Sequence, residues 1–172
     1  MKKIQLLFTG LFLFFGILTN AQDTGKTITQ NISASKDHTF LATNITASGL
    51  SQTLSGKGPF TVFAPTDNAF EKSNAISVEK SVKSVSKPEL QGLVTYHVVA
   101  GKMDSKAIGA AIKSGGGKAV LTTLEGGKLT ATLDGSKLSI TDEKGNRISV
   151  ANGDNYCSNG VIHVTDKVFT KK

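Results

Sequence analysis

Three histidines and one cysteine are the side chains of this sequence best suited to metal binding or proton transfer. The histidines are His38, His97 and His163, and the cysteine is Cys157. No two of the histidines share the close spacing that is typical of zinc ligands, and a single cysteine cannot supply a thiolate pair. We therefore predict no metal site and no other bound cofactor.

Serine, cysteine and phosphate chemistry lack the local sequences that they require. The stretch 49–53, Gly-Leu-Ser-Gln-Thr, lacks the second glycine of a nucleophile elbow. The glycine run 115–117 leads to Lys118 and Ala119, where a phosphate-binding loop needs a serine or threonine after the lysine. Nothing in the sequence places a base beside Cys157, which we expect to be a buried, unreactive thiol. The chain is therefore predicted not to be an enzyme.

The first residues have the order of a secretory signal peptide. Lys2 and Lys3 precede an apolar run, 4–18, and small residues follow up to Ala21. The run is shorter than the about 20 residues that span a bilayer, and no later stretch is longer. We predict a cleaved signal peptide over residues 1–21, no transmembrane segment after cleavage, and a secreted or periplasmic protein.

The charge of the chain limits its partners. The formal net charge is +7, which falls to +5 when Lys2 and Lys3 are removed. The remaining lysines are spread among carboxylates, without a basic cluster interleaved with aromatic residues, and tryptophan is absent. We therefore expect no nucleic-acid partner. A dispersed positive surface suits attraction to anionic polysaccharides, or it is simply solvated.

The elements that must position these side chains begin with helices. Residues 22–36, rich in Thr, Ser, Asn and Gln, have no sustained hydrophobic period and are predicted to be a flexible leader. Helices are expected after Asp37, Pro88 and Asp104, because apolar residues follow each at helical spacing. Residues 60–64 are short, apolar and typical of a strand.

The period changes to two beyond the glycine run 115–117. Each interruption of this pattern contains residues that tolerate positive φ, which predicts antiparallel hairpins with turns at 125–127, 134–135, 143–146 and 152–153. Residues 161–169 are expected to close the chain as a last strand. Helices around one early strand, followed by a β meander, predict a single α+β domain.

Three stretches resemble the signature boxes of the fasciclin domain family, in the order that the family has them. They are Gly58–Phe70, Leu93–Lys102 and Ser158–Val168, and residues 121–126 are similar to the strand that opens the family's meander. The resemblance covers a domain at 37–170. It implies a fasciclin-like wedge of two mainly antiparallel β-sheets packed with several helices, and a role in adhesion or matrix binding outside the cell.

The resemblance implies a first candidate binding segment, formed by Tyr96, His97, Val98 and Val99. The family's Tyr-His pair and its apolar neighbours are associated with binding. The alternative is that His97 lies at the edge of the core and donates a hydrogen bond to the first box at positions 66–67. Exposed Val98 and Val99 would then form the binding surface.

The second candidate segment consists of Asp154, Asn155 and Tyr156. In animal members that bind integrins, the resemblance places an Asp-Ile pair at the first two of these positions. The aspartate is present here, but asparagine replaces the apolar partner. His163, between two apolar residues on the last strand, is expected to be structural.

Two functions from different classes fit these patterns. The first is a secreted adhesion module that binds extracellular or envelope proteins or anionic polysaccharides by non-covalent contacts. The second is a structural protein of the cell envelope, periplasmic or associated with the outer membrane, that has no external ligand. The sequence leaves the oligomeric state open.

Overall fold

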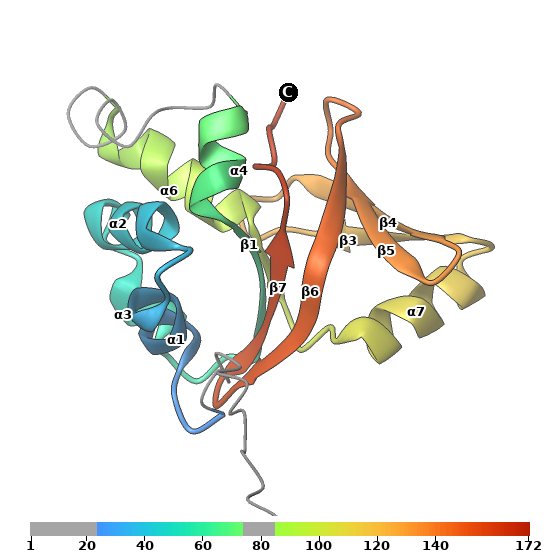
Figure 1. Cartoon of the computed structure of the whole chain (residues 1–172), viewed down its shortest axis with the longest axis horizontal. Helices are drawn as coiled ribbons and strands as arrows, with labels where there is room; N and C mark the ends of the chain where they lie inside the picture. The colour runs from blue at the N-terminus through green and yellow to red at the C-terminus, as the bar shows by residue number, and fades with distance from the viewer. Residues whose placement is uncertain (1–23, 74–84) are drawn as a thin grey trace, which may run out of the picture.

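The computed structural model describes residues 24–73 and 85–172, so the predicted signal peptide at 1–21 lies outside the described residues. Helices come first and strands dominate the second half, as the hydrophobic periods predict (Figure 1). None of the described helices is long and apolar enough to cross a membrane. The elements are α1 (Ile28–Ala34), α2 (Thr39–Ser48), α3 (Ser51–Leu54), β1 (Phe60–Pro65), α4 (Asp67–Lys72), α6 (Lys87–Tyr96), β2 (Val98–Ala100), α7 (Ser105–Ser114), β3 (Lys118–Thr122), β4 (Lys128–Asp134), β5 (Lys137–Thr141), β6 (Arg147–Cys157) and β7 (Gly160–Thr165).

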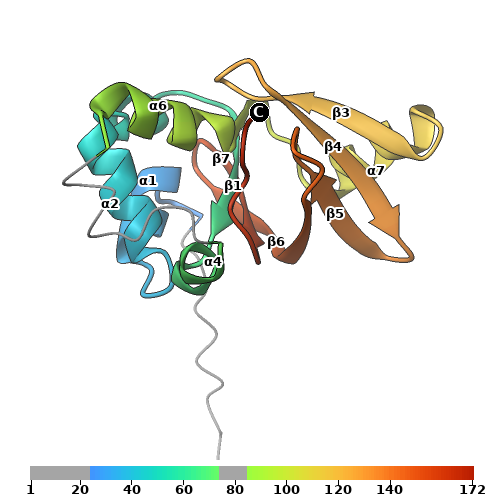
Figure 2. The same ribbon diagram turned by 90° about the horizontal axis from the view of Figure 1, so that it is seen from above.

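The strands of the described chain follow one another in space in the order β2-β1-β7-β6-β5-β4-β3. β1 and β7 are parallel, and the other neighbouring pairs are antiparallel. β6 pairs with β5 through its first residues and with β7 through the rest, with register shifts between Val150 and Asn155. β6 thus joins two half-sheets that open as a wedge (Figure 2). The predicted wedge of two mainly antiparallel sheets packed with helices is confirmed.

Two hydrophobic clusters hold the wedge together. The helices α1, α2, α3, α4 and α6 lie together beside β1 and β7, while α7 lies against β3 and β4 (Figures 1 and 2). The first cluster joins the helical layer to β1 and β7, with Ile32 and Ile162 among its members. The second fills the space between the half-sheets and α7, with Phe63, Ile108 and Phe169 among its members. The covering of both sheet faces near β1 explains why the five residues after Phe60 in that strand are all buried.

The two edges of the curved sheet meet at one point. Val99 in β2 forms an isolated antiparallel bridge with Thr123, and Leu124 N donates to Val98 O at 2.7 Å. This bridge places the Tyr-His segment against the first turn of the meander.

The leader predicted at 22–36 is not flexible throughout, because it contains α1. Thr27 and Gln30 form a capping box, and Ile28 and Ile32, one helical turn apart, are 0% and 1% exposed in the first cluster. Only two apolar positions contribute, so the sequence showed no sustained period. Their burial depends on partners more than 100 residues away, such as the Asn159 Oδ1 that accepts from Ile28 N at 2.9 Å.

The three predicted helix starts are confirmed, since α2, α6 and α7 begin at Thr39, Lys87 and Ser105. Asp104 Oδ1 accepts from Ala107 N at 2.8 Å, and Pro88 lies in the first turn of α6. Asp37, in contrast, does not cap α2. The carboxylate of Asp67 performs this role instead, since it accepts from the backbone N–H groups of both Thr39 and Phe40. The cap comes from another element, which sequence spacing does not reveal.

The closing strand is shorter than the 161–169 expected. β7 ends at Thr165, and the chain then continues without strand pairing. Val168 and Phe169 remain buried at 3% and 1% exposed, because each enters one of the two hydrophobic clusters. The apolar pattern thus correctly predicted that Val168 and Phe169 are buried, but it incorrectly predicted that they belong to a strand.

Candidate functional site

The Tyr-His segment is buried, so the expectation that it offers an exposed binding surface is wrong. Tyr96 ends α6, His97 caps that helix, and Val98 and Val99 belong to β2. Their exposed fractions are 2%, 1%, 0% and 5%. Val98 enters the first cluster and Val99 the second, because β2 pairs with β1 where both sheet faces are covered.

His97 joins the end of α6 to the C-terminal segment. Its Nε2 accepts a hydrogen bond from Phe169 N at 2.9 Å, so its Nδ1 donates to Leu93 O, 2.8 Å away. The ring also stacks on Phe169, with centroids 4.9 Å apart. Burial lowers the pKa of His97 to about 4. The expected bond to Thr66 and Asp67 is not formed, because Asp67 caps α2.

His163 is a second buried histidine with backbone partners. It is 0% exposed, its Nε2 lies 2.8 Å from Met103 O, and its ring stacks on Phe63. Burial lowers its pKa, so the neutral form is favoured. Both rings thus hold backbone segments together deep in the fold.

The second candidate segment lies at the surface and meets residues from the start of α7. Tyr156 is 39% exposed, its hydroxyl donates to Asp104 Oδ2 at 3.3 Å, and Lys102 Nζ lies 4.6 Å from its ring centroid. Asp154 Oδ1 accepts from Ser105 N at 2.6 Å. We call the group Lys102, Asp104, Asp154 and Tyr156 the Tyr156 surface.

The backbone of this surface is held in an uncommon conformation. Asp154 has a φ of 58°, in the left-handed region, and follows the register shifts of β6. Its N–H points to His163 Nδ1 at 3.4 Å, and Asn155 Nδ2 donates to Ile162 O at 3.2 Å. The structure therefore fixes Asp154 and Asn155 through backbone contacts, and leaves the ring of Tyr156 as the accessible group.

Charges around the tyrosine are mutually consistent. The hydrogen bond from Ala107 N is the main cause that lowers the pKa of Asp104, with smaller contributions from Tyr156 and Lys102. Desolvation, together with the carboxylates of Asp154 and Asp104, raises the pKa of Tyr156. At neutral pH the surface thus presents a neutral phenol between an ammonium group and carboxylates.

Residues 24–73 and 85–172 contain no cluster of three or more histidine, cysteine or acidic side chains able to hold a metal ion. Cys157 is buried as expected, accepts a hydrogen bond from Asn31 Nδ2 at 3.2 Å, and has a pKa raised by burial. A thiol in this state is a poor nucleophile.

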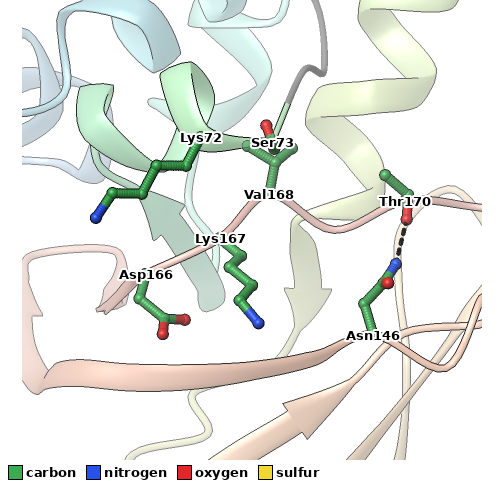
Figure 3. Close-up of a pocket in the computed structure, with 7 residues that line it drawn as sticks. All are labelled: Lys72, Ser73, Asn146, Asp166, Lys167, Val168 and Thr170. Carbon is green, nitrogen blue, oxygen red and sulfur yellow. Dashed lines mark hydrogen bonds between the residues drawn. The ribbon is translucent and has the colours of Figure 1, made fainter.

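A pocket of about 330 Å³ opens between the end of α4, the β5–β6 turn and the C-terminal segment (Figure 3). Several of its polar groups already bind the protein. Asn146 Nδ2 donates to Thr170 Oγ1 at 2.8 Å, Lys167 Nζ to Arg147 O at 3.0 Å, and Asp166 Oδ1 accepts from Ser149 N at 2.7 Å. No sequence pattern predicts this pocket, because its walls come from three separate segments.

The wedge of two half-sheets and the three boxes that form parts of it point to one protein family. The sequence model of the fasciclin domain matches residues 36–171, and the chain belongs to this family. The chain is similar to Protein sll1483 of Synechocystis sp., with 35% identity over 87% of this chain and 76% of that protein. It is also 34% identical to human periostin over 84% of this chain and 16% of that protein.

A solved structure shares the fold. The FAS1 domain pair from the insect cell adhesion molecule fasciclin I superposes with a TM-score of 0.71 at 17% identity, over 85% of this chain and 51% of that chain. The present chain thus spans about half the length of that chain.

Proposed function

We propose that the chain is an exported adhesion module that binds an extracellular or cell-envelope protein through the Tyr156 surface, without catalysis. The observation that carries this proposal is the exposed ring of Tyr156, fixed between Lys102 and Asp104. Tyrosine is enriched among the residues that dominate protein interfaces. Because hydrogen bonds already order its neighbours, binding there costs little conformational entropy.

Two further observations support the proposal. The first 21 residues have the pattern of a signal peptide, which supports secretion or a periplasmic location. The fold is shared with an insect cell adhesion molecule, although fold alone does not determine function. Export predicts that protein recovered outside the cytoplasm begins after residue 21, which N-terminal sequencing would test.

Binding to immobilised matrix and envelope proteins, at low and high salt, tests the adhesion role. Tyr156→Ala should weaken saturable binding by about ten-fold or more, as expected for a central interface tyrosine. Leu133→Ala is the matched control, because Leu133 is also an exposed apolar side chain, at 46%, but lies on β4. It should bind like the unchanged protein.

The alternative is a structural protein of the envelope. An unchanged affinity for Tyr156→Ala would reject the Tyr156 surface as the binding site. The absence of saturable binding to any external protein, combined with recovery in the envelope fraction, would instead favour the structural role.

A further inference from the structure

The half-sheet from β3 to β6 has an outer face that none of the described helices covers. In Figure 2, α7 lies on one side of β3 and β4, and no labelled helix lies on the other. Burial alternates along β3 and the first part of β4, and the strand register extends the same outward-facing positions to β5 and the start of β6. We call these residues the outer sheet face: Lys118, Val120, Thr122, Lys128, Thr130, Thr132, Asp134, Lys137, Ser139, Thr141, Arg147 and Ser149.

Strand register arranges these side chains in rows. One row crosses all four strands at Val120, Thr130, Thr141 and Arg147, and the next crosses at Lys118, Thr132, Ser139 and Ser149. Strands about 4.8 Å apart and side chains about 6.8 Å apart along each strand give a lattice of about 14 by 20 Å. A surface of this shape suits an extended ligand better than a compact one.

Each of the four strands places one cation on this lattice. Lys118, Lys128 and Lys137 are exposed, and Arg147 forms a surface ion pair at 3.3 Å with Asp134, which is the only carboxylate of the face. Such an exposed pair is weak and exchanges easily with a ligand anion. The surrounding rim adds Glu143, Asp166 and Lys167, whose side chains bond to the backbone of Lys128, Ser149 and Arg147. Face and rim together therefore keep an excess of positive charge.

Between the cations lie five exposed or half-buried hydroxyl groups without protein partners in the described residues. No side-chain hydrogen bond is formed there by Thr122, Thr130, Thr132, Thr141 or Ser149, whereas Ser139, also on this face, is buried at 5% exposed. Threonines elsewhere in the fold do form such bonds, as when Thr61 Oγ1 donates to Gly101 O at 2.7 Å. The hydroxyls of the outer sheet face can therefore donate to and accept from a ligand.

We propose that the outer sheet face binds a carboxylated polysaccharide, laid across the strands. The carboxylates contact Lys118, Lys128 and Lys137, and the sugar hydroxyls exchange hydrogen bonds with the serine and threonine hydroxyls. A protein partner fits less well, because the face has no aromatic side chain and no pocket to anchor one. Single-stranded nucleic acid would also require aromatic stacking.

Repetition compensates for weak contacts to each sugar. A polymer presents many equivalent sugar units to the same lattice. When one unit dissociates, a neighbouring unit of the same chain binds in its place, because its effective concentration at the surface is high. This inference rests on the proposed export of the chain but not on the Tyr156 surface, which lies on the other half of β6.

Binding of the purified protein to immobilised polygalacturonate tests the inference, with dextran as the neutral polymer and polyglutamate as the anion without sugar hydroxyls. Saturable binding to polygalacturonate, weaker at high salt, is expected, and it should exceed binding to dextran. Lys118→Glu with Lys128→Glu should lower the affinity about ten-fold or more, since two attractions become repulsions. Lys106→Glu with Lys113→Glu on α7 makes the same charge change elsewhere and should lower it no more than about two-fold.

A second variant separates sugar recognition from charge. Thr130→Val with Thr132→Val keeps the β-branched shape and removes two hydroxyls, so polygalacturonate affinity should fall about five-fold while polyglutamate affinity stays unchanged. The proposal would be overturned if the charge variants of the outer sheet face and of α7 lost polygalacturonate affinity equally. It would also be overturned if the double threonine variant lost affinity equally for polygalacturonate and polyglutamate. A loss of polygalacturonate binding in Tyr156→Ala alone would transfer this ligand to the Tyr156 surface, and so also overturn it. If the variants of the outer sheet face still bind the protein ligand with unchanged affinity, the proposed adhesion function does not depend on this inference.

Discussion

Single buried polar residues join segments that are distant in this chain. Asn159 is an example, since its Oδ1 accepts from Ile28 N at 2.9 Å and its Nδ2 donates to Leu54 O at 2.8 Å and Gly56 O at 2.9 Å. One side chain thereby satisfies three backbone groups that would otherwise be buried without partners. His97 and His163 act in the same way. The family motifs at these positions are therefore explained by hydrogen bonding within the core.

Gly127 offers a test of how tightly Tyr96 is packed. A Cβ at this position would lie 2.3 Å from Tyr96 Cε2 and 2.9 Å from Cδ2. Gly127→Ala should therefore lower the free energy of unfolding by about 1–3 kcal/mol, the usual cost of overpacking. Denaturant titration measures the change.

Gly92→Ala is the control for this substitution. Gly92 lies inside α6, where an added Cβ meets nothing within 4 Å. The same change should therefore stabilise the protein by about 0.5–1 kcal/mol through helix propensity. Two destabilised variants, or two stabilised ones, would contradict the packing described at Tyr96.

His97 should make the stability depend on pH. Because its folded pKa of about 4 lies below the ordinary 6.5, the unfolded chain binds more protons between these values. Its contribution to stability is complete above pH 6.5 and is lost as the pH falls towards 4. The unfolding free energy should thus fall by about 2 kcal/mol between pH 6.5 and 5 from this group.

Urea unfolding at several pH values measures this dependence. His97→Gln removes the titration and keeps an acceptor for Phe169 N, so its stability should change less over the same range. His163 and His38, whose pKa values burial also lowers, preserve part of the slope. An identical slope in the variant would show that His97 is not buried in its neutral form.

At the scale of elements, local signals were read well and distant contacts were not. The helix that Asp104 caps could be predicted from a pattern of a few neighbouring residues. The same is true of the meander and its glycine-containing turns. The cap from Asp67 to α2 and the burial of Val98 depend on chain segments that meet only in the fold. The exposure expected of Val98 and Val99 was wrong for this reason, since apolar residues beside a polar pair are equally typical of a core strand.

The helix α1 is an element whose existence was not predicted from the sequence. Ile32→Ala should lower the free energy of unfolding by about 2–5 kcal/mol, because the side chain is 1% exposed within the first cluster. Ser33→Ala, on the exposed side of the same helix, should change it by less than about 0.5 kcal/mol. Thermal unfolding of both variants checks the difference. A flexible leader would give no loss for either one.

At the scale of the whole molecule, β6 separates two surfaces of different character. Its first residues carry Arg147 and Ser149 on the outer sheet face, and its last part carries Asp154 and Tyr156. The outer sheet face is basic and rich in hydroxyl groups, and the Tyr156 surface has one fixed aromatic ring. A module with both could attach a polysaccharide to a protein, which is a use of a single domain that needs no oligomer.

Independence of the two surfaces is the last prediction. They share no residue and no hydrogen bond, so substitutions in one should not couple to the other. A triple variant combines Tyr156→Ala with Lys118→Glu and Lys128→Glu. Its affinity for the protein ligand should fall by the same factor as in Tyr156→Ala alone. Its affinity for polygalacturonate should fall by the same factor as in the double lysine variant alone. Titration of each ligand against all three variants measures the coupling free energy, which should lie within about 0.5 kcal/mol of zero. A larger value would mean that both ligands contact one continuous site, or that β6 transmits strain between its two halves.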